Sequence, residues 1–542
     1  MRRPRQRWLF LLVLAGGIAS FTSLWYAART DSGGDVPAFG GSYIEGVAGA
    51  PARINPLFAP LSDVDAGLAS LVFSGLTRLD DKGRPFPDLA EGWEVSEDGR
   101  VYTFRLRRGV LWHDGAELTA DDVLFTYRML QAPDARTAPG LNDVLGQVSV
   151  SKVDALTVTF ATPQPFAALP AYLKLGILPR HLLGGVSATD LFDAPFNQRP
   201  VGTGPYRLLE LTPERAVLMA NPAYHLGQPY IQRLELRFYR DDGAVIRALQ
   251  ARQIEAALLS SGVNPTDYLH LQQRSDLRLY TLPGPEVTFV YLNLRLPMFG
   301  DRRVRQALLY ALDRDQIVAE TLAGQVAVAD SPLPPGSWPY SPALARYDFD
   351  PGLAGLLLDE AGWRLTSRGV RSDGRTDLEL TLATNSDPVR VAVAEEISKR
   401  WAAIGVKANV SGIGATSLVR DLLEPRSYEA ALFAYHGGVD PDPYPAWHST
   451  QTSKGGRNLS SLNDTRVDRI LEDARLAASP ARRTDLYREF QEIFAQEVPA
   501  LPLYASTVIY VQKASVRGAR LGYFEDPGSR FWQVQDWYVK TR

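Results

Sequence analysis

The feature that most constrains the fold is an alternation of strand-like and helix-like segments from Gly41 to the C-terminus, without a repeat of fixed period. A chain of this kind packs helices against a sheet instead of stacking identical units. Its 542 residues, 45% of them hydrophobic, suffice for two to four packed units at about 100 to 200 residues each. The sequence therefore predicts an α/β architecture with more than one packed unit.

Five segments predict strands. In four of them apolar residues alternate with other residues, and this period of two suits a sheet with one buried face. They are residues 101–106 (VYTFRL), 156–160 (LTVTF), 234–239 (LELRFY) and 378–383 (LELTLA). The fifth segment, residues 287–294 (VTFVYLNL), is apolar nearly throughout, which indicates a strand covered on both faces.

Two stretches predict amphipathic helices. Apolar residues at steps of three and four form one stripe over residues 389–404, where Asp387 can cap the first turn and Gly405 can end the helix. A second stripe covers residues 304–322 and is followed by Gly324. We interpret both stripes as core-facing surfaces.

The N-terminus predicts a membrane address. Four arginines lie within the first seven residues, and the apolar run 8–28 that follows approaches the ~20 residues needed to span a bilayer. Positive charge before the run predicts that the chain after Arg29 is exported. Because Tyr26 disfavours cleavage after Ala28, we interpret residues 1–28 as a retained signal anchor, with a cleaved signal peptide as the alternative. Residues 29–41, which are rich in glycine, then predict a flexible tether.

Composition and motifs exclude several classes of function. A formal charge of -3 argues against a nucleic-acid partner. The absence of cysteine excludes disulfides, thiolate metal sites and a lipidated cysteine. The six histidines contain no HExxH pair, and neither a Gly-x-Ser-x-Gly elbow nor a GxxxxGK[ST] loop is present. The sequence therefore predicts a protein that is not an enzyme and needs no cofactor.

One cluster of polar residues requires separate treatment. His436, Asp440, Asp442 and His448 lie within thirteen residues, and all are types that can bind a divalent metal ion. Three prolines at positions 441, 443 and 445 indicate instead a loop rich in turns, in which aspartate caps turns and helix starts. We favour a structural turn beside a ligand site, and keep metal binding and direct ligand contact as alternatives.

Residues 54–127 closely resemble the signature region of the family 5 extracellular solute-binding proteins. The matching elements there are 55–57 (NPL), 73–76 (FSGL), 87–93 (PDLAEGW), 96–99 (SEDG), 102–104 (YTF), 107–110 (RRGV), 112–115 (WHDG) and 118–123 (LTADDV). The likeness continues at 201–206 (VGTGPY), 221–224 (NPAY), 291–294 (YLNL), 303–308 (RVRQAL), 361–363 (AGW), 440–443 (DPDP) and 498–504 (VPALPLY). It covers essentially the whole chain after the tether.

The resemblance implies an α/β, bilobal, periplasmic-binding-protein-like fold of type II, with two lobes, a hinge, and an extra subdomain in lobe one. Lobe one would comprise residues 42–76, 200–287 and 506–542, with the subdomain inserted at 77–199. Lobe two would comprise residues 288–505. The ligand is expected between the lobes.

The same resemblance implies the function. The family includes the oligopeptide- and dipeptide-binding proteins of ABC importers, so we expect a monomer, anchored on the extracytoplasmic face, that delivers peptides or peptide-like solutes to permease subunits. The alternatives are a binding protein for an oligosaccharide, an opine-like compound or chelated nickel, and a membrane-anchored sensor ectodomain.

The resemblance also places the ligand-binding residues. They are expected in the loop Phe58, Pro60, Leu61, Ser62 and Asp63, on the strand at Tyr291 and Asn293, in the segment Tyr435, His436, Gly437, Gly438, Val439, Asp440 and Asp442, and at Trp447 and Tyr504. Peptide-binding members hold the ligand's ammonium with an aspartate shortly before the Asp-Pro motif, and a gap-free alignment places Val439 there. Asp440 would take that role only if the loop is displaced by one residue.

Overall fold

The structure, a computed structural model, describes residues 36–138, 140–259, 263–477 and 479–541. The predicted signal segment, residues 1–28, and the first part of the tether lie outside the described residues. Within these ranges no helix has both the length and the apolar character needed to cross a membrane.

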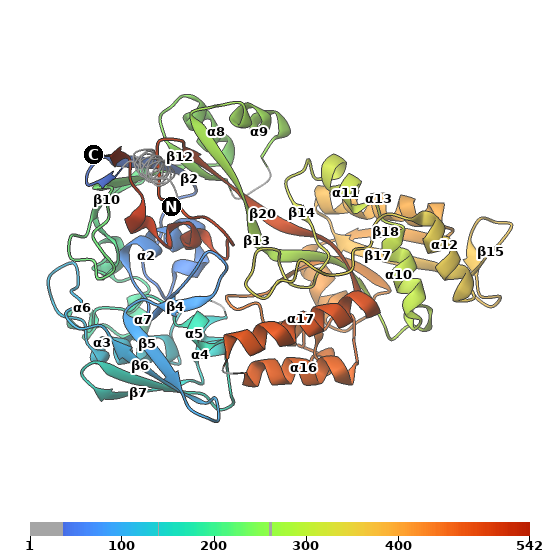
Figure 1. The fold of residues 1–542 in the computed structure, drawn as a ribbon, viewed down its shortest axis with the longest axis horizontal. Helices are drawn as coiled ribbons and strands as arrows, with labels where there is room; N and C mark the ends of the chain where they lie inside the picture. The colour runs from blue at the N-terminus through green and yellow to red at the C-terminus, as the bar shows by residue number, and fades with distance from the viewer. Residues whose placement is uncertain (1–35, 139, 260–262, 478, 542) are drawn as a thin grey trace, which may run out of the picture.

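Two lobes lie side by side and share one sheet (Figure 1). The sheet has eleven strands, ten of them in the order β18-β17-β19-β13-β20-β12-β2-β11-β10-β9, and β14 adds to β20. The connecting strands are β13 (Leu277–Leu292) and β20 (Ala500–Lys513), which pair antiparallel and run from one lobe into the other. Their register shifts between Pro283 and Val287, where the chain passes between the lobes.

Lobe one contains one end of the shared sheet. Its strands are β2 (Ser42–Ala48), β9 (Tyr206–Leu211), β10 (Arg215–Ala220), β11 (Arg233–Tyr239) and β12 (Ala256–Leu259). Strand β2 pairs in parallel with both β11 and β12. The helices α2 (Asp63–Val72), α8 (Asp242–Gln250) and α9 (Pro265–Gln272) pack around this part of the sheet.

The extra subdomain of lobe one has its own antiparallel sheet, in the order β5-β6-β8-β7. These strands are β5 (Ala90–Val95), β6 (Val101–Leu106), β7 (Ser149–Asp154) and β8 (Thr157–Ala161). Helix α3 (Ala120–Gln131) buries Val123 and Tyr127 against them, and α4 (Leu141–Leu145), α5 (Leu169–Tyr172), α6 (Arg180–Leu183) and α7 (Ala188–Leu191) complete the unit.

Lobe two has a core on each face of its sheet. The strands β17 (Glu379–Asn385), β18 (Lys407–Ile413) and β19 (Ala430–His436) run parallel to one another. One face packs against α10 (Arg302–Tyr310), α12 (Pro351–Glu360) and α13 (Pro388–Ala403). The other face packs against α15 (Tyr444–Trp447), α16 (Thr465–Leu476) and α17 (Pro480–Glu497).

The predicted elements agree with the observed ones except in one helix. The strands β6, β8, β11, β13 and β17 occupy the five predicted segments, and α13 is capped by Asp387 and followed by Gly405 at φ +83°. The helix predicted over residues 304–322 is wrong as a continuous helix. The chain breaks after α10, Asp313 caps a short helix α11 (Arg314–Gln316), and a π-helical turn (Ile317–Thr321) follows.

The break has a physical cause in Arg314. This buried guanidinium donates hydrogen bonds to the carbonyl oxygens of Ala329, at 2.6 Å, and Pro502, at 3.2 Å, and it also pairs with Asp330. Reaching these acceptors requires Arg314 to lie against the sheet, so the helix restarts at a new angle. The apolar period could not show this, because the partners come from distant parts of the chain.

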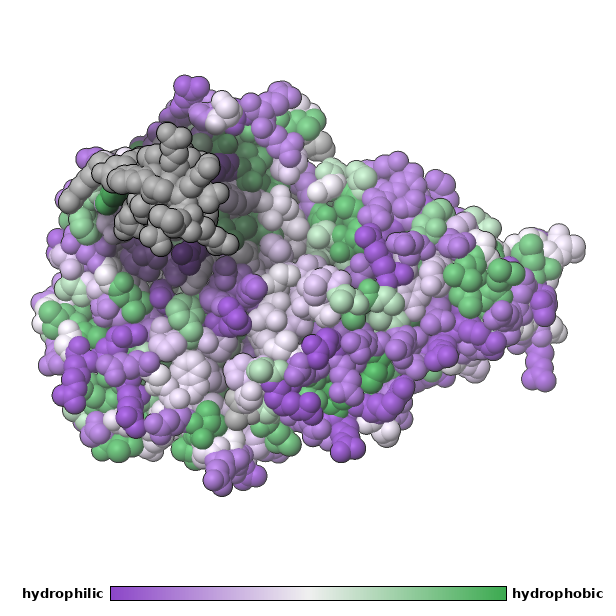
Figure 2. All heavy atoms as spheres, in the orientation of Figure 1, coloured by the Kyte–Doolittle hydropathy of each residue, from purple (hydrophilic) through white to green (hydrophobic). Residues whose placement is uncertain are grey.

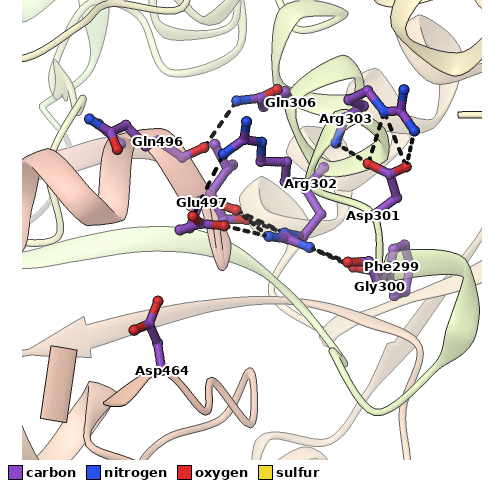
Figure 3. A network of polar contacts seen from close by, with 12 residues as sticks. Phe299, Gly300, Asp301, Arg302, Arg303, Gln306, Asp464, Gln496 and Glu497 are labelled. Atoms are coloured by element: carbon purple, nitrogen blue, oxygen red, sulfur yellow. Dashed lines mark hydrogen bonds and ion pairs between the residues drawn. The ribbon is translucent and has the colours of Figure 1, made fainter. Parts of the chain in front are cut away.

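A second buried guanidinium joins α10 to the end of α17. Arg305 donates to the carbonyl oxygens of Glu497, at 2.5 Å, and Phe299, at 2.8 Å, close to Val498, which ends α17 in the left-handed conformation. Figure 3 shows this network from close by, with Glu497 at its centre. Arg305 therefore satisfies helix-end carbonyl groups that would otherwise lack donors.

We predict that Arg305→Gln lowers the free energy of unfolding by on the order of 2 to 4 kcal/mol, because several buried carbonyl groups lose their donor. Arg302→Gln is the matched control, since its side chain is 59% exposed and its ion pair with Glu497 measures 3.8 Å. This control should change stability by less than about 0.5 kcal/mol. Guanidinium unfolding curves measure both, and equal effects would contradict the assignment.

Candidate ligand-binding site

Strand β19 has a free edge where it approaches lobe one. It pairs with β13 along its whole length, from Ala430 to His436, but pairs with β17 only at Ala430 and Ala431. Beyond Ala431 no strand pairs with the second edge among the described residues, although the Leu432 carbonyl oxygen accepts from Thr384 Oγ1 of β17 at 3.4 Å. Backbone groups on such an edge can pair with an added strand.

The segment after β19 forms a tight turn. Gly438 has φ +78°, and its backbone N–H donates to His436 Nδ1 at 3.0 Å. The N–H of Asp442 donates to the carbonyl oxygen of Asp440 at 2.8 Å. The proline-rich segment is therefore a structural turn next to the free edge, as favoured from the sequence.

Both aspartates of this turn are paired with arginines. Asp440, with 1% of its surface exposed, accepts two hydrogen bonds from Arg483, at 2.8 Å and 2.5 Å. Asp442 accepts from Arg475 at 2.7 Å, and the Arg475 guanidinium also lies 3.7 Å from the centre of the Tyr444 ring. The two carboxylates are thus neutralised by residues of α16 and α17.

Lobe one meets this turn through Tyr172. A Cβ atom at Gly438 would lie 3.6 Å from the Tyr172 hydroxyl, so the two lobes are in close contact here. Burial, followed by the nearby carboxylates of Asp440 and Asp442, raises the pKa of Tyr172. The Ala167 backbone N–H, also from lobe one, donates to the Arg475 carbonyl oxygen at 3.3 Å.

A half-buried charge cluster lies near Tyr172. Lys174 forms ion pairs with Glu525 and Asp526, and its distance to Asp526 is 2.5 Å. Burial raises the pKa of Glu525 to about 7, although Lys174 opposes that rise. Figure 2 shows pale residues of intermediate hydropathy where the lobes meet, while hydrophilic residues gather over α16 and α17.

The predicted lobe-one loop lies beside this cluster. Phe58 is buried against Phe192, whereas Pro60, Leu61 and Asp63 are exposed and Ser62 is half-buried and caps α2. Although the residue is exposed, partial desolvation of its carboxylate raises the pKa of Asp63, with Arg530 lowering it and Asp526 raising it further. The exposed part of the loop therefore adjoins the junction of the lobes.

The structure places several predicted residues in the core of lobe two. Trp447 is fully buried and stacks on Tyr291, with ring centroids 6.0 Å apart. Asn293 is buried and donates to the carbonyl oxygens of Arg426 and Tyr428. These three side chains support the sheet and do not reach the junction of the lobes in this conformation.

The remaining predicted residues lie along the junction, in different environments. His436 is exposed, while Tyr435, Gly437 and Val439 are half-buried. Tyr504 is 8% exposed on β20. An open surface hollow of about 550 Å³ lies elsewhere, between Thr119 and His181 of the extra subdomain.

The four residues of the possible metal cluster do not converge. His448 is buried, and its ring nitrogens lie 2.8 Å from Thr450 Oγ1 and 3.3 Å from Glu472 Oε1. Across the described residues, no group of three or more His, Cys, Asp or Glu is arranged to hold a metal ion.

Comparison with known proteins identifies the family. Residues 84–458 match the bacterial extracellular solute-binding proteins, family 5 Middle. This match covers more than half of the chain, and the chain therefore belongs to that family. It is a family of solute-binding proteins, not one of enzymes.

Named relatives support the assignment over the whole chain. The sequence is 28% identical over 540 residues to the oligopeptide-binding protein AppA of Bacillus subtilis, covering 98% of this chain and 96% of AppA. The structure of AppA in complex with a nonapeptide superposes with a TM-score of 0.64 at 27% identity, covering 93% of this chain and all of the other. NikZ from Campylobacter jejuni, in complex with Ni(L-His), gives a TM-score of 0.66 at 28% identity, covering 92% and 99%.

Several residues at the junction escaped the sequence analysis. They are Tyr172, Lys174, Arg475, Arg483 and Glu525. One indication that such a residue exists was present in the sequence, because a buried aspartate requires a cationic partner. The sequence contains 58 lysines and arginines, however, and nothing in it identifies which of them lies near Asp440.

We predict that Glu525→Gln changes how stability depends on pH. The pKa of Glu525 rises from an ordinary 4.5 to about 7 on folding, so the folded protein holds this proton more tightly than the unfolded chain does. The associated stability is present below pH 4.5 and is lost as the pH rises to about 7. Denaturant unfolding at pH values across this range should show that the free energy of unfolding falls less with rising pH in the variant than in the unaltered protein.

Glu489→Gln, at an exposed position of α17, is the control for this experiment and should keep the decline of the unaltered protein. The same pH dependence in the unaltered protein and in Glu525→Gln would show that Glu525 titrates normally.

Proposed function

We propose that this chain captures a peptide or peptide-like solute between its two lobes, outside the cytoplasm, and delivers it to the permease of an ABC importer. The observation that carries the proposal is the free edge of β19 at the junction of the lobes. Family membership and the relatives named as peptide-binding proteins support it.

The free edge suits an extended ligand. A peptide backbone that adds to β19 beyond Ala431 gains main-chain hydrogen bonds that do not depend on the ligand's side chains. Lobe one then covers the ligand through the loop at Pro60 and Leu61 and through Tyr172. Because the hydrogen bonds involve the ligand's main chain, such a site binds peptides without a strict preference for their sequence.

The ligand's amino terminus is not the anchoring group. Val439 has no charge, and Asp440 already holds the buried guanidinium of Arg483. A ligand ammonium placed there would have to displace that arginine, which would leave a buried charge unpaired. We therefore extend the proposal to ligands whose amine is blocked.

We expect free and N-acetylated versions of the same peptide to raise the melting temperature equally, because neither forms an ion pair with Val439 or Asp440. A ligand at a concentration a hundredfold above its Kd adds roughly 2.7 kcal/mol to the free energy of unfolding, which a thermal-shift assay detects. In Val439→Asp the free amine should be preferred. Strong rejection of acetylated peptides by the unaltered protein would assign the ammonium role to another carboxylate.

The resemblance to NikZ gives a second candidate, a chelated metal ion, since that protein was solved with Ni(L-His). His436 is exposed at the junction and is the residue best placed to contact such a complex. Including Ni(L-His) in the same thermal-shift panel separates the candidates, because a shift lost in His436→Ala, with none from peptides, would favour the chelate.

We further propose that residues 1–28 anchor a monomer to the membrane and that the domain boundaries are those expected from the family. On this proposal the full-length protein sediments with membranes and is released by proteolysis near residues 29–41. N-terminal sequencing of the cellular protein measures the outcome. Recovery of soluble protein that lacks its first residues would support the cleaved signal peptide instead.

A further inference from the structure

The two ends of the described chain are fixed side by side on lobe one. Strand β1 (Pro37–Ala38) pairs antiparallel with β21 (Lys540–Thr541). The Gly40 backbone N–H donates to the Tyr230 carbonyl oxygen at 2.8 Å, and Phe39 stacks on the Tyr230 ring, with ring centroids 4.8 Å apart. The point at which the chain enters lobe one is therefore held in place by backbone and ring contacts.

Apolar and aromatic side chains are exposed around this point. Phe39 is 52% exposed, and Val36 is 58% exposed. Tyr230 and Tyr538 are half-buried, and their ring centroids lie 6.4 Å apart, so they continue the row of rings that begins at Phe39. Tyrosine combines an apolar ring with a polar hydroxyl, and such side chains suit the boundary between lipid and water.

Two cations lie next to the same rings. Lys540 is exposed, and its Nζ atom lies 3.2 Å from the position of a Cβ atom at Gly40. Arg517 is exposed as well, and its backbone exchanges two hydrogen bonds with the backbone of Tyr538, at 2.9 Å and 3.0 Å. Aromatic and basic side chains are thus combined on one small area of lobe one.

The neighbouring carboxylates do not cancel this positive charge. Glu235 forms ion pairs with both Arg233, at 3.3 Å, and Arg237, at 2.8 Å. The Arg233 backbone N–H donates to the Gly41 carbonyl oxygen at 3.3 Å, which places this group of charges next to β1. Partial desolvation raises the pKa of Asp536, and two arginines lower it. Cations therefore outnumber carboxylates here, which favours an anionic partner surface.

The length of chain before Val36 indicates which surface this is. Seven residues, 29–35, separate the predicted membrane anchor, 1–28, from Val36. A chain of this length spans at most about 25 to 30 Å when fully extended. A bilayer that holds residues 1–28 therefore lies within that distance of the exposed rings on lobe one.

We propose that this area of lobe one binds an anionic lipid surface and so fixes the orientation of lobe one on the membrane. We name it the β1–β21 face, and it comprises Val36, Phe39, Tyr230, Arg517, Tyr538 and Lys540. The proposal rests on the membrane anchoring proposed above and extends it. With lobe one docked in this way, closure around a solute moves lobe two toward a lobe that stays in place.

The test uses the absence of cysteine, because one introduced cysteine carries a fluorophore at a single known position. Gln228→Cys places the label at an exposed position close to Tyr230. Val153→Cys is the control, at an exposed position of β7, which Figure 1 shows far from β2 and β10 at the other end of lobe one. Each full-length protein is reconstituted in vesicles containing lipid with a nitroxide on its headgroup, which quenches nearby fluorophores.

We expect strong quenching at residue 228 and little at residue 153 in vesicles of phosphatidylglycerol mixed with phosphatidylcholine. Raising the ionic strength from ~0.1 M to ~1 M shortens the Debye length from about 10 Å to about 3 Å and should reduce the quenching at residue 228 by about half or more. Vesicles of phosphatidylcholine alone should give a similar reduction, because they carry no net charge.

A pair of charge variants tests the face itself. Lys540→Glu should reduce the quenching at residue 228, because it places a carboxylate against anionic lipid. Lys454→Glu makes the same change of charge at an exposed position of lobe two and should leave the quenching intact. The melting temperature of each variant, with and without peptide, is measured alongside, so that a loss of fold or of solute capture is recognised separately.

Two results would overturn the proposal and leave solute capture standing. One is equal quenching at residues 228 and 153. The other is quenching at residue 228 that responds neither to salt, nor to lipid charge, nor to Lys540→Glu, because the short tether alone would then explain it.

Cellular protein that lacks residues 1–28 would contradict the anchor, and the face is then tested on that processed protein. It should sediment with vesicles that contain phosphatidylglycerol and not with vesicles of phosphatidylcholine alone. Failure to sediment with either would overturn the proposal.

Discussion

The antiparallel pairing of β13 with β20 is the interaction on which the rest of the structure depends. It carries the shared sheet from one lobe to the other, and its register changes between Pro283 and Val287, where the lobes are joined. Since both strands continue into both cores, each lobe is packed as a unit while the connection stays narrow. A domain movement that opens and closes around a solute needs this combination of rigid lobes and a short hinge.

Several charges at the junction of the lobes are neutralised by ion pairs within the protein. Asp440 and Asp442 are each held by an arginine from α17 or α16, and Lys174 is held by Glu525 and Asp526. In these pairs the carboxylates of Asp440 and Asp442 are occupied by arginine guanidinium groups of the protein.

Local physics made much of the fold predictable. The segment 101–106 became β6 because its period of two matches a strand with one buried face, and Asp387 capped α13 because a side-chain oxygen there satisfies free N–H groups. The prediction of one continuous helix over 304–322 was wrong for a non-local reason. Arg314 bonds to Ala329 and Pro502, and those distant acceptors override the local helical preference.

By itself the sequence determined the alternation of elements, the absence of disulfides and the family, since periodicity, composition and ordered motifs are all local properties of the chain. Only the tertiary structure decided which candidate residues face the junction. It placed Tyr291 and Trp447 in the core and paired Asp440 with Arg483. The reason is that burial and ion pairing depend on residues far away in the sequence, which only the packed fold brings together.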